Sequence, residues 1–140
     1  MGSLLAFDFG EKRLGIAHTD PLNIIASGLT TLSPSEAINF LKKYKLQNNI
    51  DALVIGQSKR YDGSFPTIEK KVLKFINELE RNLPEIKIIR YDERFTSKIA
   101  KKTILESGLK KLKRRNKKLV DKISATIILQ SYLESIKNTQ

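Results

Sequence analysis

The sequence predicts an α/β fold built on a mixed five-stranded sheet, with helices packed on both of its faces. Three short strand-like runs follow one another near the N-terminus, separated only by short polar segments. From residue 33 onward, segments with helical spacing of apolar residues alternate with runs typical of buried strands. An antiparallel meander that leads into alternating strands and helices indicates a sheet with both antiparallel and parallel neighbours.

The first three strands are expected to form the meander. Two of them lie at residues 3–10 (SLLAFDFG) and 13–20 (RLGIAHTD). The segment between them, GEK at 10–12, has the length and composition of a hairpin turn. The run IIASGLTTL, at 24–32, is expected to continue the meander as the third strand.

The first helix is expected to begin at a capping box. The segment SPSE at 33–36 has serine followed three positions later by glutamate, with proline at the first helical position. Apolar residues then follow on one helical face, namely Ala37, Phe40, Leu41 and Tyr44. The run DALVIG at 51–56 is the next strand, and it reads as buried because it is almost continuously apolar.

A polar loop, QSKRYDGS at 57–64, separates this strand from the second helix. The apolar residues of that helix have helical spacing and are Ile68, Val72, Phe75, Ile76 and Leu79. The segment NLP at 82–84 is expected to end it. A strand at 86–91 (IKIIRY), the loop DERFT and a helix at 99–105, which Gly108 can terminate, are expected next.

The last helix is expected to follow a dense basic run. Its apolar face is traced by Leu119, Val120, Ile123, Ile127, Ile128 and Leu133. With 140 residues, the whole chain (1–140) is expected to be a single domain, which is long enough to enclose a core.

Composition narrows the classes of function. The chain has 26 Lys and Arg against 15 Asp and Glu, a net charge of +11, which favours a polyanionic partner. It has no cysteine, which excludes disulfides and thiolate metal sites. Because it has a single histidine, catalysis by a Ser-His-Asp triad or a Cys-His pair is not favoured. No apolar run approaches the roughly 20 residues that span a bilayer. The protein is therefore expected to be soluble and cytoplasmic.

Three acidic residues occur where an α/β arrangement gathers function, beyond the carboxyl ends of the strands. Asp8 ends the first strand, Glu93 follows the strand at 86–91, and Asp121 lies among the apolar residues of the last helix. Each has apolar neighbours in the sequence, and burying an ionised carboxylate without a partner costs several kcal/mol. If the three converge, something must neutralise them.

Lysine and arginine side chains or divalent cations could neutralise such a cluster. Carboxylates from separate segments, without His or Cys, favour Mg²⁺ or Mn²⁺ over zinc. These ions leave coordination positions open for water and for phosphate oxygens. Combined with a basic surface, the arrangement suits two-metal hydrolysis of a phosphodiester.

Each acidic residue also has a structural alternative. Asp8 could be a turn residue at the strand end, paired with Arg13. Glu93 could form a salt bridge or cap a helix, because DERFTS also resembles a helix entry with Thr96 as N-cap. Asp121 could stabilise the dipole at the N-terminus of the last helix. The informative prediction is therefore that the three converge.

Four segments, spread over nearly the whole chain, carry a resemblance to a known family. They are AFDFGEKRLGIAHTD at 6–20, VIGQSKRYDGS at 54–64, RYDERFTS at 90–97 and LVDKISATIILQSYLE at 119–134. In this order they resemble the YqgF-type (RuvX) proteins, the family of pre-16S rRNA nucleases whose members are also called Holliday junction resolvases.

The resemblance implies a ribonuclease H-like fold in which Asp8, Glu93 and Asp121 bind Mg²⁺ or Mn²⁺ and carry the catalysis. It also implies that Arg13 and Arg94 lie near the site as partners of phosphate or carboxylate, since an arginine fork binds either group with two hydrogen bonds. For Arg13, direct contact with substrate and a salt bridge that orients Asp8 or Glu93 are both open.

The basic run KKLKRRNKK, at 110–118, immediately precedes the helix that carries Asp121. It is expected to be a nucleic-acid-binding loop at the mouth of the site, and a solvated connection is the alternative. Its positive residues are Lys110, Lys111, Lys113, Arg114, Arg115, Lys117 and Lys118.

Together these expectations favour an endonuclease that uses Mg²⁺ or Mn²⁺ to hydrolyse phosphodiester bonds, and the resemblance implies precursor 16S rRNA as its substrate, in ribosome biogenesis. A Holliday junction resolvase acting on branched DNA is one alternative, and it needs a dimer. A non-catalytic RNA-binding factor for ribosome assembly is the other. The expected partners are nucleic acid and the ribosomal particle, without a membrane, and the chain is expected to act as a monomer or a weak homodimer.

Overall fold

The computed structural model describes residues 2–20, 22–57, 67–92 and 117–138. Its five strands form one sheet in the order β3-β2-β1-β4-β5. The β1, β2 and β3 strands pair antiparallel, whereas β4 pairs parallel with both β1 and β5. This confirms the predicted mixed sheet. In chain order the elements are β1 (Ser3–Phe9), β2 (Leu14–Thr19), β3 (Ala26–Leu32), the 3₁₀ turn η1 (Pro34–Glu36), α1 (Ala37–Gln47), β4 (Ile50–Gln57), α2 (Ile68–Asn82), β5 (Ile88–Asp92) and α5 (Lys117–Asn138).

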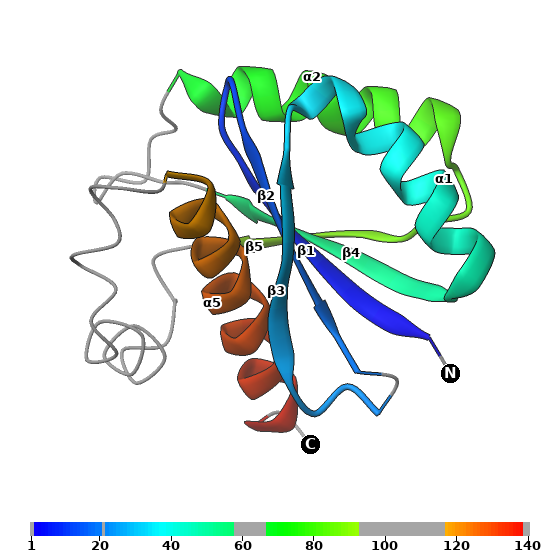
Figure 1. Cartoon of the computed structure of the whole chain (residues 1–140), viewed down its shortest axis with the longest axis vertical. Helices are drawn as coiled ribbons and strands as arrows, with labels where there is room; N and C mark the ends of the chain where they lie inside the picture. Colours follow the sequence, from blue (N-terminus) through cyan, green and yellow to red (C-terminus); the bar gives the residue numbers. More distant parts are fainter. Residues whose placement is uncertain (1, 21, 58–66, 93–116, 139–140) are drawn as a thin grey trace.

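The helices lie on both faces of the sheet, as predicted. Figure 1 shows α1 and α2 over one face and α5 against the other. In the part of the chain that the structure describes, none of the helices combines the length and the apolar character that crossing a membrane requires.

Alternation along β1 assigns its side chains to the two faces. Leu5 and Phe7 belong to the hydrophobic cluster under α1 and α2, and Leu4 and Ala6 belong to the cluster under α5. Because successive side chains of a strand point to opposite faces, Asp8 follows Ala6 onto the α5 face.

The α5 face of the sheet is lined by small residues. Ala6, Ala17 and Ala52 are buried there, and Gly15 adds a position without a side chain. The helix contributes Ala125 and three leucine or isoleucine residues to the same cluster. Small side chains let the helix approach the sheet closely, which brings the backbone of α5 near the strands.

The predicted hairpin between the first two strands is confirmed. The Gly10 N–H donates to the Arg13 carbonyl at 2.8 Å and closes the turn. A Cβ at Gly10 would lie 2.8 Å from that carbonyl oxygen, so the tight turn requires glycine there.

The third strand is shorter than the sequence indicated, because it begins at Ala26. The expected start at residue 24 was wrong. The Asp20 carboxylate accepts hydrogen bonds from the backbone N–H groups of Ile24 and Ile25, at 2.8 and 2.9 Å. These bonds hold both isoleucines in the turn, where they are exposed.

The first helix begins where the sequence predicted, but its first turn is 3₁₀. Glu36 reaches back to Ser33 and accepts from both its backbone N–H and its hydroxyl, at 3.2 and 2.7 Å. These bonds lower the pKa of the Glu36 carboxyl below its ordinary value. The α-helix proper then runs from Ala37.

The buried face of α5 matches the predicted one at Ile128 and Leu133 and differs from it elsewhere. Ala125, Ile128, Leu129 and Leu133 are buried, whereas Ile123 and Ile127 are only partly buried. Because apolar residues occur almost all around this helix, the spacing in the sequence could not identify the inward face. The helix packs on β1, β2 and β3, and the small residues of those strands select the side that faces them.

Two predicted elements lie outside the described residues. They are most of the loop at 57–64, of which only Gln57 is described, and the helix at 99–105. The second helix ends at Asn82, the first residue of the predicted NLP stop, and β5 covers most of the predicted strand at 86–91.

The only histidine makes a testable link between the sheet and α1. His18 Nδ1 lies 3.0 Å from the Tyr44 hydroxyl, and partial burial lowers the pKa of His18 below its ordinary value of 6.5. The unfolded chain therefore binds a proton more readily, so the stability from this group is present above about pH 6.5 and is lost as the pH falls through the folded-state pKa. Urea unfolding of wild type and His18→Gln between about pH 5 and 7 should show a flatter pH dependence for the variant. The same pH dependence of the free energy of unfolding in both proteins would show that His18 does not contribute to it.

Candidate active site

The carboxyl ends of the three parallel strands meet at one edge of the sheet. Asp8 is the next-to-last residue of β1, Gln57 ends β4 and Asp92 ends β5. In the parallel register Gln57 pairs with Asp92, while Phe7 pairs with Ile55. Open α/β sheets place ligands at this edge, so the predicted site lies where the fold class expects it.

Gly15 brings two of the predicted acids together. Asp8 is paired directly with Gly15 across β1 and β2, so a side chain at either position would point to the same face. On that face a Cβ at Gly15 would lie only 2.0 Å from the backbone oxygen of Asp121. The α5 backbone therefore rests on Gly15, which places Asp121 beside Asp8 from opposite ends of the chain.

Arg13 is bonded directly to one of these acids. Its Nε donates to Asp121 Oδ2 at 2.6 Å, and the side chains are 38% and 20% exposed. Arg13 lies in the segment between β1 and β2, so this ion pair links that hairpin to the first half of α5. From the sequence, Arg13 was expected near the site with Asp8 or Glu93 as its carboxylate partner. Its bond to Asp121 was not expected.

The first turn of α5 shows whether Asp121 could serve to stabilise the helix dipole, which was the structural alternative for this residue. That turn contains no acidic residue, since α5 begins at Lys117 and Asp121 comes after the first turn. Stabilisation of the helix dipole is concentrated in the first turn, so it does not account for Asp121. The Lys118 carbonyl accepts from the Thr31 hydroxyl at 2.5 Å, which ties this end of α5 to β3.

Several predicted site residues lie outside the described residues. They are Glu93, Arg94, Lys110, Lys111, Lys113, Arg114 and Arg115. Lys117 is the first residue of α5, and Lys118 is exposed in the same turn. In the described part of the chain, no group of three or more His, Asp or Glu side chains could hold a metal ion. Two of the three predicted acids, Asp8 and Asp121, belong to that part.

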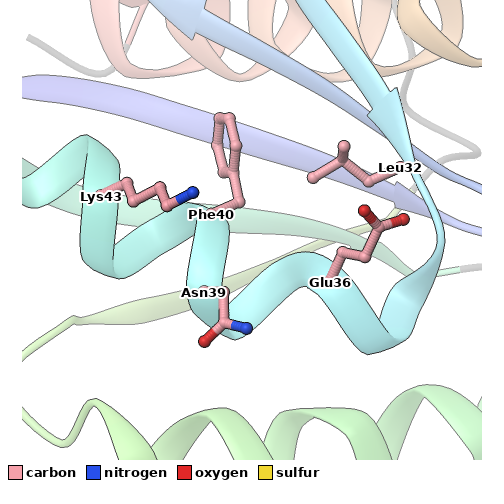
Figure 2. Close-up of a pocket in the computed structure, with 5 residues that line it drawn as sticks. All are labelled: Leu32, Glu36, Asn39, Phe40 and Lys43. Carbon is pink, nitrogen blue, oxygen red and sulfur yellow. The ribbon is translucent and has the colours of Figure 1, made fainter.

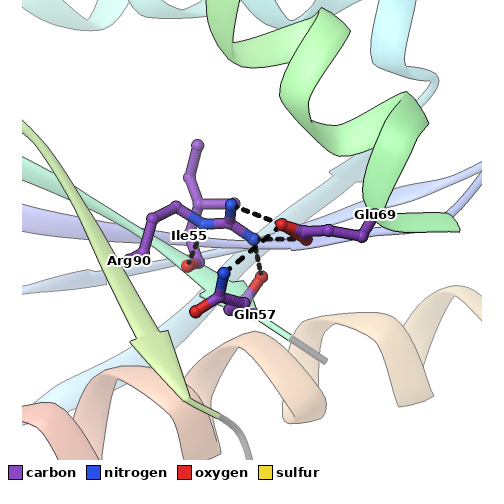
Figure 3. A network of polar contacts seen from close by, with 5 residues as sticks. Ile55, Gln57, Glu69 and Arg90 are labelled. Carbon is purple, nitrogen blue, oxygen red and sulfur yellow. Dashed lines mark hydrogen bonds and ion pairs between the residues drawn. The ribbon is translucent and has the colours of Figure 1, made fainter. Parts of the chain in front are cut away.

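An ion pair that the sequence analysis missed lies at the same edge of the sheet. Arg90 of β5 donates to both carboxylate oxygens of Glu69, with Nη2 2.7 Å from Oε1 and Nη1 2.9 Å from Oε2 (Figure 3). Its Nε and Nη2 also donate to the carbonyls of Ile55 and Gly56, at 3.3 and 3.1 Å. Arg90 therefore links the end of β4 to the first turn of α2 through hydrogen bonds to both.

A signal for this ion pair is present in the sequence. Glu69 has helical spacing with Val72, Ile76 and Leu79, so it belongs to the buried face of α2. Only 5% of Glu69 is exposed. A charged residue in line with a buried apolar face requires a partner of opposite charge, and Arg90 fulfils that requirement.

Tyr91 lies on the α5 face, where it is partly buried against the hydrophobic cluster under that helix. Its ring meets Tyr132 of α5 edge-on, with centroids 6.1 Å apart. Burial raises the pKa of the Tyr91 phenol above its ordinary value of 10.0, and the carboxylates of Glu134 and Asp92 add to the effect. This phenol therefore stays protonated at neutral pH.

The chain is similar in sequence to known proteins over nearly its whole length. A family model described as "RuvX: Holliday junction resolvase" matches residues 2–135. A relative from Flavobacterium psychrophilum, named "Putative pre-16S rRNA nuclease", is 47% identical over 95% of this chain and 97% of its own. A relative of the same name from Parabacteroides distasonis is also 47% identical, over 98% of both chains.

A solved structure shows the same fold. The chain matches RuvC of T. thermophilus, which was solved in complex with a Holliday junction substrate, with a TM-score of 0.58 over 96% of both chains. The identity is 13%, so this likeness bears on the fold alone, and it confirms the ribonuclease H-like α/β architecture. The match of the family model to almost every residue, together with relatives near half identity, shows that this chain belongs to the RuvX family.

Proposed function

We propose that this chain is a Mg²⁺- or Mn²⁺-dependent endonuclease that hydrolyses phosphodiester bonds of precursor 16S rRNA, with Asp8, Glu93 and Asp121 as its metal-binding acids. The observation that carries the proposal is the position of Gly15, which pairs with Asp8 across β1 and β2 and lies against the backbone of Asp121. The names of the relatives support the class of reaction and the RNA substrate.

The donor set fits a hard divalent cation. Asp8 and Asp121 supply carboxylate oxygens from two elements, and Glu93 is the residue that follows the last residue of β5, Asp92. A divalent ion bound there supplies Lewis acidity and lowers the pKa of a bound water. The net charge of +11 supports attraction of a polyanionic strand to the surface around these acids.

Arg13 has two roles in this proposal. Through Nε it holds Asp121 in place. The guanidinium carries four further N–H donors, and more than a third of the side chain is exposed, so the same group can also bind a phosphate of the substrate. Arg94 and the basic run at 110–118 would add further phosphate contacts, and Lys118 is exposed at the start of α5.

The proposal is tested by cleavage of three nucleic acids with purified protein. The substrates are a 5′-extended fragment of 16S rRNA, an unstructured single-stranded RNA and a four-way DNA junction, each with Mn²⁺, Mg²⁺ or EDTA. Wild type should cleave the rRNA fragment only when the ion is present. Asp8→Asn should slow cleavage at least about 100-fold, equivalent to about 2.7 kcal/mol of transition-state stabilisation.

A matched control removes a carboxylate from the other end of the sheet. Asp51 is exposed near the start of β4, and Asp51→Asn should leave the cleavage rate unchanged. Cleavage in EDTA, or full activity of Asp8→Asn, would overturn the metal-dependent site. Cleavage of the junction alone would favour a resolvase, the function that the description of the family model names. Tight RNA binding without any cleavage would favour the non-catalytic assembly factor.

A further inference from the structure

A hollow lies on the other side of the sheet from Asp8. Phe9 is the next residue along β1, and its ring packs toward α2, with its centroid 5.1 Å from that of Phe75. The hollow has a volume of about 280 Å³. It is lined by Phe9, Pro34, Ser35, Lys71, Lys74, Phe75 and Glu78. Its floor is therefore aromatic and apolar, and two lysines stand at its rim.

The exposed surface of α2 is basic at the end nearest the candidate active site. Lys70, Lys71 and Lys74 are exposed in its first half, and the exposed acid Glu80 comes in its second half. The one acid of the first turn, Glu69, is buried and paired with Arg90. Because α2 follows β4, this basic half begins at the carboxyl edge of the sheet.

The hollow and the candidate site flank one short turn. Glu11 lies in the segment between β1 and β2 and forms an ion pair with Lys71, which lowers the pKa of the Glu11 carboxyl. The same segment carries Arg13, which holds Asp121. Figure 1 shows α2 passing over the tip of this hairpin. A nucleic-acid strand that passes from Asp8 over the β1–β2 turn would therefore reach Lys71.

A second hollow of about the same volume differs in its charges. It is lined by Leu32, Glu36, Asn39, Phe40 and Lys43 at the start of α1 (Figure 2). Its single lysine is balanced by Glu36, whose lowered pKa keeps that carboxylate ionised and repulsive to phosphate. The lining of the hollow beside Phe9 has two lysines and one acid, Glu78, and Glu11 pairs with Lys71 from the neighbouring turn. A phosphate can take the place of the exposed Glu11 carboxylate on Lys71, and Lys74 adds a second positive charge, so this hollow is the better site for an anionic strand.

We infer that the hollow beside Phe9 is a subsite for single-stranded nucleic acid, in which one base packs on the partly buried Phe9 ring while neighbouring phosphates bind Lys71 and Lys74. Aromatic side chains next to a basic rim are the features with which proteins bind single strands irrespective of sequence. The inference rests on the proposed nuclease function, because it assigns the subsite to the strand that runs away from Asp8. A duplex does not fit, since its bases are stacked and paired.

The test is binding of a fluorescein-labelled single-stranded RNA, measured by anisotropy without divalent ions over a range of salt. Each phosphate contact to a single strand contributes about 0.7 to the slope of log K against log salt. Lys71→Gln/Lys74→Gln should therefore reduce the slope by about 1.4 and weaken binding about 25-fold near 0.1 M salt. Phe9→Leu, which keeps an apolar side chain against Phe75, should weaken binding about tenfold without changing the slope.

The matched control is Lys42→Gln/Lys45→Gln, which removes the same charge from α1. Both control lysines are exposed, and Lys45 forms an ion pair with Glu85 as Lys71 does with Glu11. The control should change the slope much less. An equal change in both double variants, or equally tight binding of duplex RNA, would overturn the subsite.

The same samples separate this inference from the proposed function. Cleavage by wild type that Lys71→Gln/Lys74→Gln leaves unchanged, with unchanged binding, would overturn the subsite and leave the nuclease in place. Binding that depends on Lys71, Lys74 and Phe9 without cleavage of any substrate would support the subsite and overturn the nuclease.

Discussion

Gly15→Ala is expected to lower the free energy of unfolding by about 3 kcal/mol and to abolish cleavage. The new Cβ would lie 2.0 Å from the backbone oxygen of Asp121 and 2.4 Å from its carbonyl carbon. A backbone carbonyl in a helix cannot rotate away as a side chain can, so α5 must move off the sheet. That movement carries Asp121 away from Asp8 and strains the bond to Arg13.

Urea unfolding at constant temperature measures the loss of stability, and cleavage of the rRNA fragment measures the loss of the site. Gly28→Ala is the matched control, because Gly28 lies on β3 under the same helix. Its Cβ would lie 3.2 Å from Lys122 Cβ and 3.3 Å from Thr126 Oγ1, so the helix would have to shift by only a few tenths of an ångström. If the two variants were equally stable and equally active, Gly15 would have no special role in placing Asp121.

Glu69→Ala is expected to destabilise the protein by about 3–5 kcal/mol, because it leaves the Arg90 guanidinium without its carboxylate partner. The Arg90 and Glu69 side chains are only 20% and 6% exposed, so water replaces the lost partner poorly. The bonds from Arg90 to the carbonyls of Ile55 and Gly56 remain, but they do not neutralise its charge. Chemical denaturation of wild type and variant measures the change.

A double-mutant cycle distinguishes the ion pair from simple packing. Glu69→Ala/Arg90→Ala removes both charges, and it should cost much less than the sum of the single changes Glu69→Ala and Arg90→Ala. The exposed Lys45–Glu85 pair serves as a control, and Glu85→Ala should leave the unfolding midpoint unchanged. Additive effects of the two buried substitutions would show that Arg90 and Glu69 are not coupled.

Local patterns were sufficient to predict the sheet and most of its connections. Alternation along β1, the glycine turn at 10–12 and the capping box at Ser33 are short-range features, and each acts through neighbouring residues. The Asp20 carboxylate, which delays the start of β3, is also a local feature, although its effect on the turn was missed. Errors of this kind shift an element by a few residues and leave the topology unchanged.

The candidate site was predictable only in part. Its acids stood out because Asp8 ends an apolar strand and Asp121 interrupts an apolar helix. The edge of the sheet at which Asp8 lies followed from the order of the elements. By contrast, the sequence analysis did not single out Glu69, because its partner Arg90 lies 21 residues away on the next strand, β5.

By itself, therefore, the sequence determined the alternation of strands and helices, their order in a mixed sheet and the position of Asp8 at its carboxyl edge. Only the tertiary structure decided which side of α5 faces the sheet, that Asp121 rests on Gly15 and that Arg13 is bonded to Asp121. The physical reason is that the apolar residues of α5 are spread around the helix among polar ones and do not mark one face. Its rotation is set by the small residues of β1 and β2 on which it packs, and that complementarity exists only once distant segments are in contact.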